Sequence, residues 1–323
     1  MAELHAARSA PISAIVPTRE RAPVLQKMLA SLGEQSVLPA ELIVVDASAG
    51  DDSRRVVEQF GAAVAARGCR ALWQAAAVAG AAAQRNQAMA LASQPLIGFF
   101  DDDITFEPDC IERLWRALDG DPGLGGLSAM IVNQRYQPPG AISRAMFRLM
   151  AGAPAASYAG RVLGPAVNLL PEDDERLPEV VPVEWLNLGA TLYRREVLPA
   201  PPFDAFFTGY SLGEDLVLSL KVVARARLAN VRNARIFHDS QPGAYKSDAA
   251  ALSRMRLANR HYVMTQILHR RRAADYAKLA LWEAFQLASA AVAHRGGRRF
   301  WQTLAGTGRG AADILRGKRG KGA

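Results

Sequence analysis

The sequence predicts an α/β protein with a mostly parallel sheet, helices on both faces of that sheet, and further helices at the C-terminus. Short apolar runs alternate with amphipathic helical stretches from residue 12 to about residue 240. The apolar runs are continuous, as expected for strands that are buried on both faces of a parallel sheet. Beyond residue 249 only helical patterns follow.

The first half of the chain predicts four strands separated by helices. Strands are expected at 12–17 (ended by Pro17), 41–45, 96–100 and 126–132. Helices are expected at 24–32 (ended by Gly33), 53–66, 84–92 and 108–118.

The second half is less regular. Residues 133–182 are rich in Pro, Gly and Ala, which predicts a variable insertion that is partly loop and partly helix. A strand-like pattern resumes at 185–193, and a helix at 214–228 and a strand at 230–238 follow. Helices are expected from 249 to 294, broken near Arg270–Arg272. We therefore expect one α/β domain over 1–245 (halves 11–132 and 183–240) and a helical segment with a basic tail over 246–323.

Charge and cysteine content point to a cytoplasmic protein with a basic end. From Arg295 onward the chain has eight basic residues against Asp313, so this tail supplies +7 of the net charge of +8. Cys69 and Cys110 have neither a metal-type nor a disulfide-type spacing. Residues 1–11 lack the apolar core of an export signal.

Carboxylates follow two of the predicted strands. Asp46 ends one, and Asp101, Asp102 and Asp103 come directly after another. Ligands bind at the carboxyl ends of strands in such sheets. Three adjacent carboxylates repel one another unless a cation lies among them, which suits Mg²⁺ or Mn²⁺. The alternative is a solvated acidic turn that caps the next helix.

Three further positions could carry chemistry. Asp215, beside Glu214 at a helix start, could be a general base, although helix capping also explains the pair. His238 at a strand end could complete a metal site or be structural. Arg85 at a helix start could pair with phosphate or lie on the surface.

In this order the motifs resemble those of family 2 inverting glycosyltransferases of the GT-A fold. The resemblance covers residues 12–240. It rests on the segments 12–21 (ISAIVPTRER), 42–48 (LIVVDAS), 99–103 (FFDDD), 108–109 (PD), 187–191 (NLGAT) and 213–216 (GEDL).

The resemblance implies a role for each matching residue. Asp215 would be the catalytic base and Asp103, with His238, the metal-binding pair. Glu214 and Gly189 would lie on the acceptor side. The donor site would comprise Pro17, Thr18, Glu20, Asp46, Arg85, Asp101 and Asp102.

The implied reaction is one in-line displacement on a nucleoside-diphosphate sugar, with inversion, by a hydroxyl of a saccharide or a lipid-linked acceptor. Cell-surface glycan synthesis is the expected setting. Two positions depart from the family pattern. Ala47 replaces a second acid after Asp46, and the Gln-x-x-Arg-Trp motif of processive synthases is absent, so we expect non-processive transfer.

Two other functions compete with this one. A nucleotidyltransferase would need a glycine-rich N-terminal loop, which the segment 17–20 (PTRE) lacks. A non-catalytic sugar-nucleotide-binding or nucleic-acid-binding protein could use the basic tail, but the tail has little aromatic interleaving and the acidic residues would be unexplained. We therefore expect no nucleic-acid partner.

The segment Leu279–Val292 is apolar apart from three polar residues and too short to span a bilayer. With arginines on both sides, it could be an interfacial helix on an anionic membrane surface, which would place the protein peripherally on the inner face of the plasma membrane. The alternative is a helix packed on the catalytic domain or in a dimer interface, with a solvated basic tail.

Overall fold

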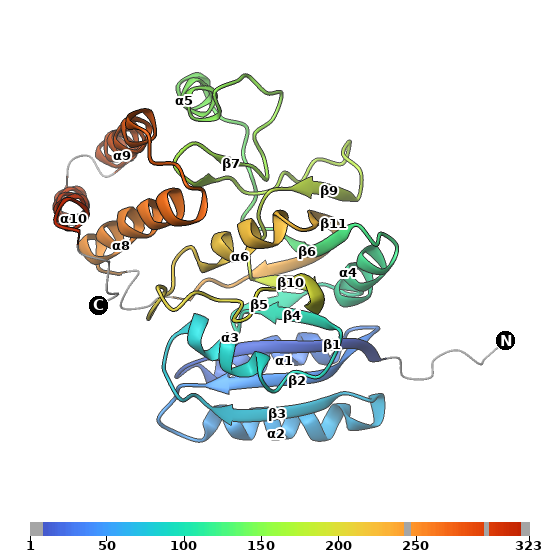
Figure 1. Ribbon diagram of the computed structural model, residues 1–323. Coiled ribbons are helices and arrows are strands. Elements are labelled where there is room, and N and C mark those ends of the chain that lie inside the picture. The colour runs from blue at the N-terminus through green and yellow to red at the C-terminus, as the bar shows by residue number, and fades with distance from the viewer. Residues whose placement is uncertain (1–8, 242–246, 294–296, 318–323) are drawn as a thin grey trace.

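The computed structural model describes residues 9–241, 247–293 and 297–317, and it forms a nine-stranded sheet covered by helices (Figure 1). The strand order is β3-β2-β1-β4-β10-β6-β11-β5, and β9 also pairs with β11. The strands are β1 Ser9–Thr18, β2 Leu38–Asp46, β3 Arg70–Ala75, β4 Leu96–Phe100, β5 Ile104–Phe106, β6 Leu124–Ile131, β9 Val180–Val183, β10 Ala190–Arg194 and β11 Arg227–His238.

Strand direction decides where the functional residues gather. β1 is parallel to β2 and β4, β2 to β3, and β6 to β11, whereas β10, β5 and β9 run antiparallel to their neighbours. Since β10 lies antiparallel between β4 and β6, these two strands share one direction. The carboxyl ends of β1, β2, β4 and β11 therefore lie at one edge. The predicted mostly parallel α/β architecture is confirmed.

Two helical layers enclose the sheet. Successive residues of a strand point to opposite faces, so Ile15 and Phe99 belong to one core and Val16 and Phe100 to the other. α1 (Ala22–Gly33), α2 (Asp52–Val64) and α4 (Cys110–Asp119) cover the second core, and α3 (Ala81–Met89) and α6 (Glu214–Val223) cover the first.

Three local features differ from the sequence prediction. β3 and β5 were not predicted, because β3 is a half-exposed strand at the sheet edge and β5 has three residues. The helix predicted at 214–228 ends at Val223, because the chain must turn back for Arg227 to pair with Leu124 of β6. Of the strand-like pattern at 185–193, only the part from Ala190 is a strand.

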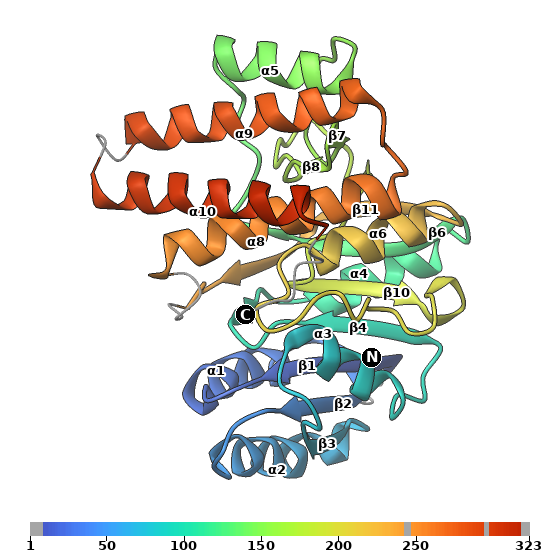
Figure 2. The same cartoon turned by 60° about the vertical axis from the view of Figure 1, so that its left-hand side comes forward.

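The predicted insertion contributes to two parts of the molecule. Its last strand, β9, extends the main sheet by pairing with β11. Its helix α5 (Ala141–Ala151) and the hairpin of β7 (Val162–Leu163) and β8 (Val167–Asn168) pack through Met150 and Tyr158 against Trp282 of α9 (Figure 2).

Three long helices end the chain: α8 (Ala249–Tyr262), α9 (Ala273–Ala293) and α10 (Arg298–Leu315). A π-helical turn at Val263–Ile267 extends α8, and the predicted break near Arg270–Arg272 is present. None of the helices in the described residues is long and apolar enough to cross a membrane.

Residues 298–315 of the expected basic tail form α10, which packs on α8, while its arginines are exposed. Gly306 and Gly310 face the α8 backbone at Ala250 and Arg254, and Arg254 forms an ion pair with Asp313 at 2.7 Å. Glycine allows this close approach because it has no Cβ. Residues 1–8, the predicted boundary at 245, and Arg295, Lys318, Arg319 and Lys321 lie outside the described residues.

Two glycines of α10 provide a matched test of this packing. A Cβ at Gly306 would overlap the Ala250 backbone, whereas a Cβ at Gly308 meets nothing within 4 Å. Both Gly→Ala changes gain about 1 kcal/mol of helix propensity, but Gly306→Ala also overpacks the contact. We expect Gly306→Ala to be less stable than Gly308→Ala by about 1–3 kcal/mol in urea unfolding. Equal stability would contradict the close α8–α10 contact.

Candidate active site

A short antiparallel pairing brings the acidic turn and the histidine together. β4 ends at Phe100, Asp101–Asp103 form the turn into β5, and β5 pairs with the end of β11, placing His238 opposite Ile104. The Asp239 amide donates to the Asp103 carbonyl at 2.8 Å. This register sets the His238 Nε2 atom 2.9 Å from Asp103 Oδ1.

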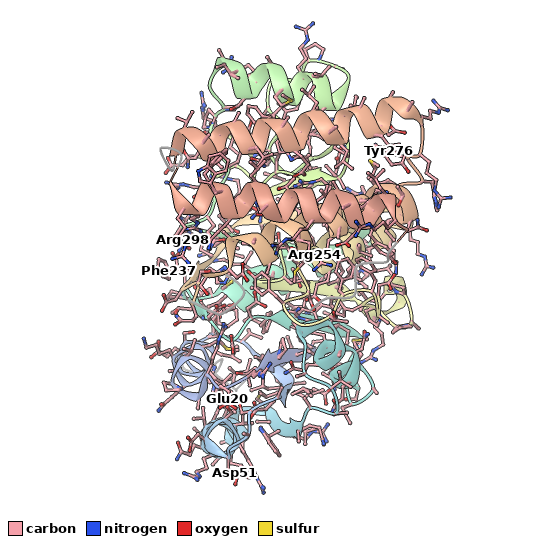
Figure 3. The ribbon with its side chains drawn as sticks, turned by 90° about the vertical axis from the view of Figure 1, so that its left-hand side faces the viewer. Glu20, Asp51, Phe237, Arg254, Tyr276 and Arg298 are labelled. Carbon is pink, nitrogen blue, oxygen red and sulfur yellow. The ribbon has the colours of Figure 1, made fainter. Side chains whose placement is uncertain are left out.

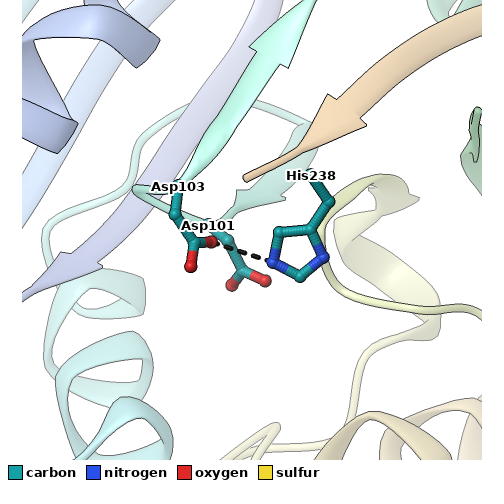
Figure 4. Close-up of side chains that lie close together, drawn as sticks. All are labelled: Asp101, Asp103 and His238. Atoms are coloured by element: carbon teal, nitrogen blue, oxygen red, sulfur yellow. Dashed lines mark hydrogen bonds and ion pairs between the residues drawn. The ribbon is translucent and has the colours of Figure 1, made fainter. Parts of the chain in front are cut away.

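Asp101, Asp103 and His238 form a candidate metal site (Figure 4). Each offers one ligand atom, and these atoms lie within 4.8 Å of one another. Gln134 contacts the other imidazole nitrogen at 3.3 Å, and Asn133 exchanges hydrogen bonds with the His238 backbone, which fixes the ring. Two carboxylates and an imidazole are a donor set that could hold a divalent metal ion.

Asp102 is held away from this cluster, against β1. Thr18 Oγ1 donates to it at 2.7 Å and Arg21 at 3.2 Å. Burial raises the pKa of Asp102 to about 6, and the Thr18 hydrogen bond opposes that rise. Burial acts in the same direction at Asp103, but the hydrogen bond and charge of His238, the Gln241 amide and the charge of Arg21 together leave that pKa below its ordinary value.

The residues expected at the donor nucleotide lie at the ends of β1 and β2. Asp46 is buried and accepts hydrogen bonds from Ser48 and from the Trp73 indole at 3.2 Å. Pro17 pairs with Val45 inside the sheet. Glu20, with a positive φ of 53°, accepts from the Ala49 amide at 2.8 Å. These contacts tie the loops after the two strands together.

Arg85 is enclosed rather than free. Its guanidinium donates to Asp101 at 2.6 Å, forms an ion pair with Glu214, and lies 5.6 Å from the centre of the Phe203 ring. Only 4% of its side chain is exposed. The sequence placed Arg85 near the donor phosphates, whereas in the structure its charge is shared between two carboxylates. Arg85 thus joins the metal cluster to the start of α6.

The start of α6 carries the expected base. Gly213, with a φ of 93°, makes the turn into the helix, and Asp215 Oδ1 accepts from the Leu216 amide at 2.7 Å. Burial raises the pKa of Asp215 to about 6. Burial also raises the pKa of Glu214, and Arg85 opposes that rise. The Gly189 carbonyl accepts from the Asp101 amide at 3.0 Å, so Gly189 supports the turn through its backbone.

The sequence analysis missed three residues of this site. Arg21 contacts Asp102 and lies 3.6 Å from Asp103. Gln84 donates to the carbonyls of Thr18 and Val45, holding β1 to β2. Tyr210 is partly exposed, and partial desolvation together with the nearby charges of Asp101, Asp103 and Asp215 raises its pKa. Arg21 and Gln84 lie within or beside recognised motifs, but only the folded geometry shows their partners.

Comparison with known proteins identifies the family of the segment that contains the ends of β1, β2 and β4. Residues 13–135 match the model described as glycosyl transferase family 2. This segment is a glycosyltransferase family 2 domain. It contains the ends of β1, β2 and β4, and hence Asp46 and Asp101–Asp103, whereas Asp215 lies outside it. The expected enzyme class, a glycosyltransferase, is confirmed. No curated protein matches the chain by sequence.

Solved structures similar to the whole chain show the fold around the family 2 domain. A mannosyltransferase, PcManGT from Pyrobaculum calidifontis, in complex with GDP-Man and Mn²⁺, has a TM-score of 0.54 and 15% identity over 95% of this chain and 88% of its own. GalNAc-T7, solved with UDP, GalNAc and Mn²⁺, has a TM-score of 0.50 and 14% identity over 70% of this chain. The match spans 43% of that longer protein. The fold is that of GT-A glycosyltransferases.

The metal cluster predicts a specific loss of Mn²⁺ binding. Removing an outer partner of a metal ligand typically lowers affinity 10–100-fold, so we expect Asp103→Asn to lower it at least about tenfold. Titration of Mn²⁺ by electron paramagnetic resonance of the free ion measures this. Asp239→Asn, which neutralises the adjacent exposed carboxylate, is the control and should bind as wild type. A similar loss in both variants would indicate a general charge effect and no defined site.

The enclosed arginine predicts a pH-dependent loss of stability. Arg85→Met leaves Glu214 buried without its cation, which typically costs about 3–5 kcal/mol. Protonation of Glu214 removes the unpaired charge, so the loss should be greater at pH 8 than at pH 5. Urea unfolding at both pH values measures it.

The double variant Arg85→Met/Glu214→Gln is the control for this prediction. It lacks the buried carboxylate and should lose less stability than Arg85→Met, with little dependence on pH. Equal, pH-independent losses in the two variants would show that the ion pair is not the cause.

Proposed function

We propose that this protein is a metal-dependent inverting glycosyltransferase that moves one sugar at a time from a nucleoside-diphosphate sugar to a hydroxyl group. The observation that supports this most strongly is the arrangement at one sheet edge. The candidate metal ligands and Asp215 lie close enough for the charge of Asp101 to raise the Asp215 pKa. A leaving-group site and a base are therefore next to each other.

In this proposal Asp101, Asp103 and His238 hold the cation and Asp215 accepts the proton of the attacking hydroxyl. A divalent cation at these ligands supplies a Lewis acid that neutralises the diphosphate as it leaves. Asp215 is suited to its role because a base with a pKa near the working pH is both ionised and able to take a proton. Arg85 holds Asp101 and the start of α6 at a fixed separation, which positions the base relative to the donor.

The donor side is assigned to the ends of β1 and β2. Pro17, Thr18, Glu20 and Asp46 would line the nucleotide pocket, and Asp102 would contact the ribose or sugar. The nucleotide sugar bound to PcManGT and the UDP bound to GalNAc-T7, each with Mn²⁺, support the same class of donor here. Ala47 replaces the second acid of the Asp46 motif, so the motif does not identify the nucleotide base of the donor. A screen of UDP-, dTDP- and GDP-sugars would identify it.

The acceptor side is assigned to the region around Gly189 and Glu214. Because the Glu214 carboxylate is enclosed with Arg85, we assign it a supporting role and leave contact with the acceptor to exposed neighbours. We propose a saccharide or lipid-linked acceptor in cell-surface glycan synthesis, on the cytoplasmic side of a membrane. In the proposed organisation residues 1–245 are catalytic and 246–323 contact an anionic membrane surface.

The assignment of Asp215 predicts a loss of turnover without a loss of donor binding. Removing a general base typically lowers the rate about 10²–10⁴-fold, and we expect this for Asp215→Asn. Release of nucleoside diphosphate from the donor identified in the screen measures turnover, with water as acceptor where no other is known. Thermal shift with nucleotide and Mn²⁺ measures binding, which should equal that of wild type.

The pH profile serves as the control for this assignment. Asp215 must be ionised to accept a proton, so wild-type kcat/KM should fall as the pH drops below about 6 and level off above it. The residual activity of Asp215→Asn should lack this limb. A wild-type profile that is flat from pH 5 to 8, or a variant that keeps the limb, would assign the proton transfer to another group.

A further inference from the structure

The two C-terminal helices α9 and α10 share an outer face that nothing in the described chain covers. They lie side by side on the outside of the molecule, with α8 beneath α10 (Figures 2 and 3). In Figure 3 Arg298 and Tyr276 mark the two ends of this face, which is turned toward the viewer. We call it the α9–α10 face.

Apolar side chains form a continuous stripe along each helix. On α10 one line of exposed uncharged residues repeats at helical spacing: Trp301, Leu304, Gly308, Ala311 and Leu315. On α9 the same holds for Ala277, Leu281, Ala284, Ala288 and Val292. The side chains of Trp301 and Leu315 are 62% and 87% exposed. An exposed apolar surface of this extent marks a site of interaction.

A row of arginines flanks the α10 stripe. Arg298, Arg309 and Arg316 are separated by three and two helical turns, so they lie along one line of the helix beside the apolar residues. All three are exposed. An apolar stripe with a cationic flank is the pattern of a helix that lies in the headgroup region of an anionic membrane.

The acidic side chains of α8, α9 and α10 do not neutralise the charge of the arginine row. Residues 247–293 and 297–317 contain eleven lysines and arginines and four acids. Glu283 pairs with Arg260, and Asp313 with Arg254. Asp248 and Asp275 accept backbone amides at the starts of their helices, so each of the four carboxylates is engaged locally.

A polar pocket beneath the face adds a place for phosphate. It lies between α8, α9 and α10 and has a volume of about 340 Å³. Its polar lining includes Arg256, Arg299, Gln286 and Thr303, and also Glu283, whose charge is paired with Arg260. Within the described part of the chain, Arg256 and Arg299 form no ion pair. Two arginines and nearby hydroxyl and amide groups match the phosphate of a lipid headgroup.

The face is joined rigidly to the candidate active site. Asn259 of α8 donates to the Leu212 carbonyl at 2.6 Å, and the Tyr262 ring stacks on Phe206 at 3.8 Å. Both contacts involve the segment that leads into Gly213 and the base, Asp215. A surface bound at the α9–α10 face would therefore stand at a fixed offset from the base.

We propose that the α9–α10 face docks on an anionic lipid bilayer, with the apolar stripes between the headgroups and the arginine row on the lipid phosphates. This extends the proposed function, because it specifies the surface that would bring a lipid-linked acceptor to Asp215. Charge complementarity favours a bilayer over a second copy of the chain, since two copies of this face would bring the arginine rows together.

Vesicle binding by the full chain tests the proposal without any donor or acceptor. Each arginine near an anionic surface contributes about fivefold in affinity, so Arg298→Glu/Arg309→Glu/Arg316→Glu should weaken binding at least on the order of a hundredfold. The matched control Arg55→Glu/Arg113→Glu/Arg225→Glu changes the net charge equally at exposed arginines elsewhere and should bind as wild type. Co-sedimentation with vesicles of phosphatidylglycerol and phosphatidylcholine measures binding.

The apolar contact has its own readout. Trp301 fluorescence should shift to shorter wavelength with the anionic vesicles, and Trp301→Phe should lose that shift while still binding. High salt should weaken the binding. Equal unfolding midpoints of the two triple variants establish that both are folded.

Three results would overturn the proposal. They are no binding of wild type to anionic vesicles, equal binding by the two triple variants, or a concentration-dependent dimer that Leu315→Ser disrupts. The vesicle-binding assay needs no turnover, so its result does not depend on whether the protein transfers a sugar. Likewise, a failure to bind vesicles would leave the glycosyltransferase assay unaffected.

Discussion

Carboxylates crowd one edge of the sheet, and their mutual repulsion is the constraint that the surrounding structure must satisfy. Asp101, Asp102, Asp103, Glu214 and Asp215 come from two segments more than a hundred residues apart. Arg85 pairs with Asp101 and Glu214. Arg21 lies against Asp102 and Asp103, and His238 hydrogen-bonds to Asp103 as well. Burying charges without such partners would cost several kcal/mol each. The cations therefore determine which carboxylates stay internal and which remain available for a ligand.

The pairing of these carboxylates with arginines and with His238 separates the charged residues of the edge into two groups. Arg85 and Glu214 are enclosed and act through position, whereas Asp101, Asp103 and His238 converge on a shared point. Asp215 accepts a backbone amide, and no cation among the described residues lies within hydrogen-bonding distance of it, so burial raises its pKa. A sheet edge with a candidate metal site and a separate buried carboxylate as the proposed base would suit group transfer from a charged donor.

The C-terminal helices connect this chemistry to the rest of the molecule. α8 follows shortly after His238 in the chain and also contacts the loop before Asp215, so it bridges both sides of the site. α10 packs on α8 through glycines, and α9 packs on α5 of the insertion through Trp282. Residues that the sequence assigned to an insertion and a tail thus form one layer beside the acceptor side.

The sequence by itself determined β1, β2, β4 and β6 of the first half, most helices and the acidic residues at the strand ends. Those features depend on local periodicity and on the order of short motifs, which a chain shows before it folds. Only the tertiary structure determined which side chains pair with one another. Arg85 faces two carboxylates because β4 and α6 meet there, and Arg21 reaches Asp102 because β1 lies beside β4. Likewise α10 is a packed helix because Gly306 fits the backbone of α8. Contacts between residues distant in the chain depend on register and packing, and no local pattern contains them.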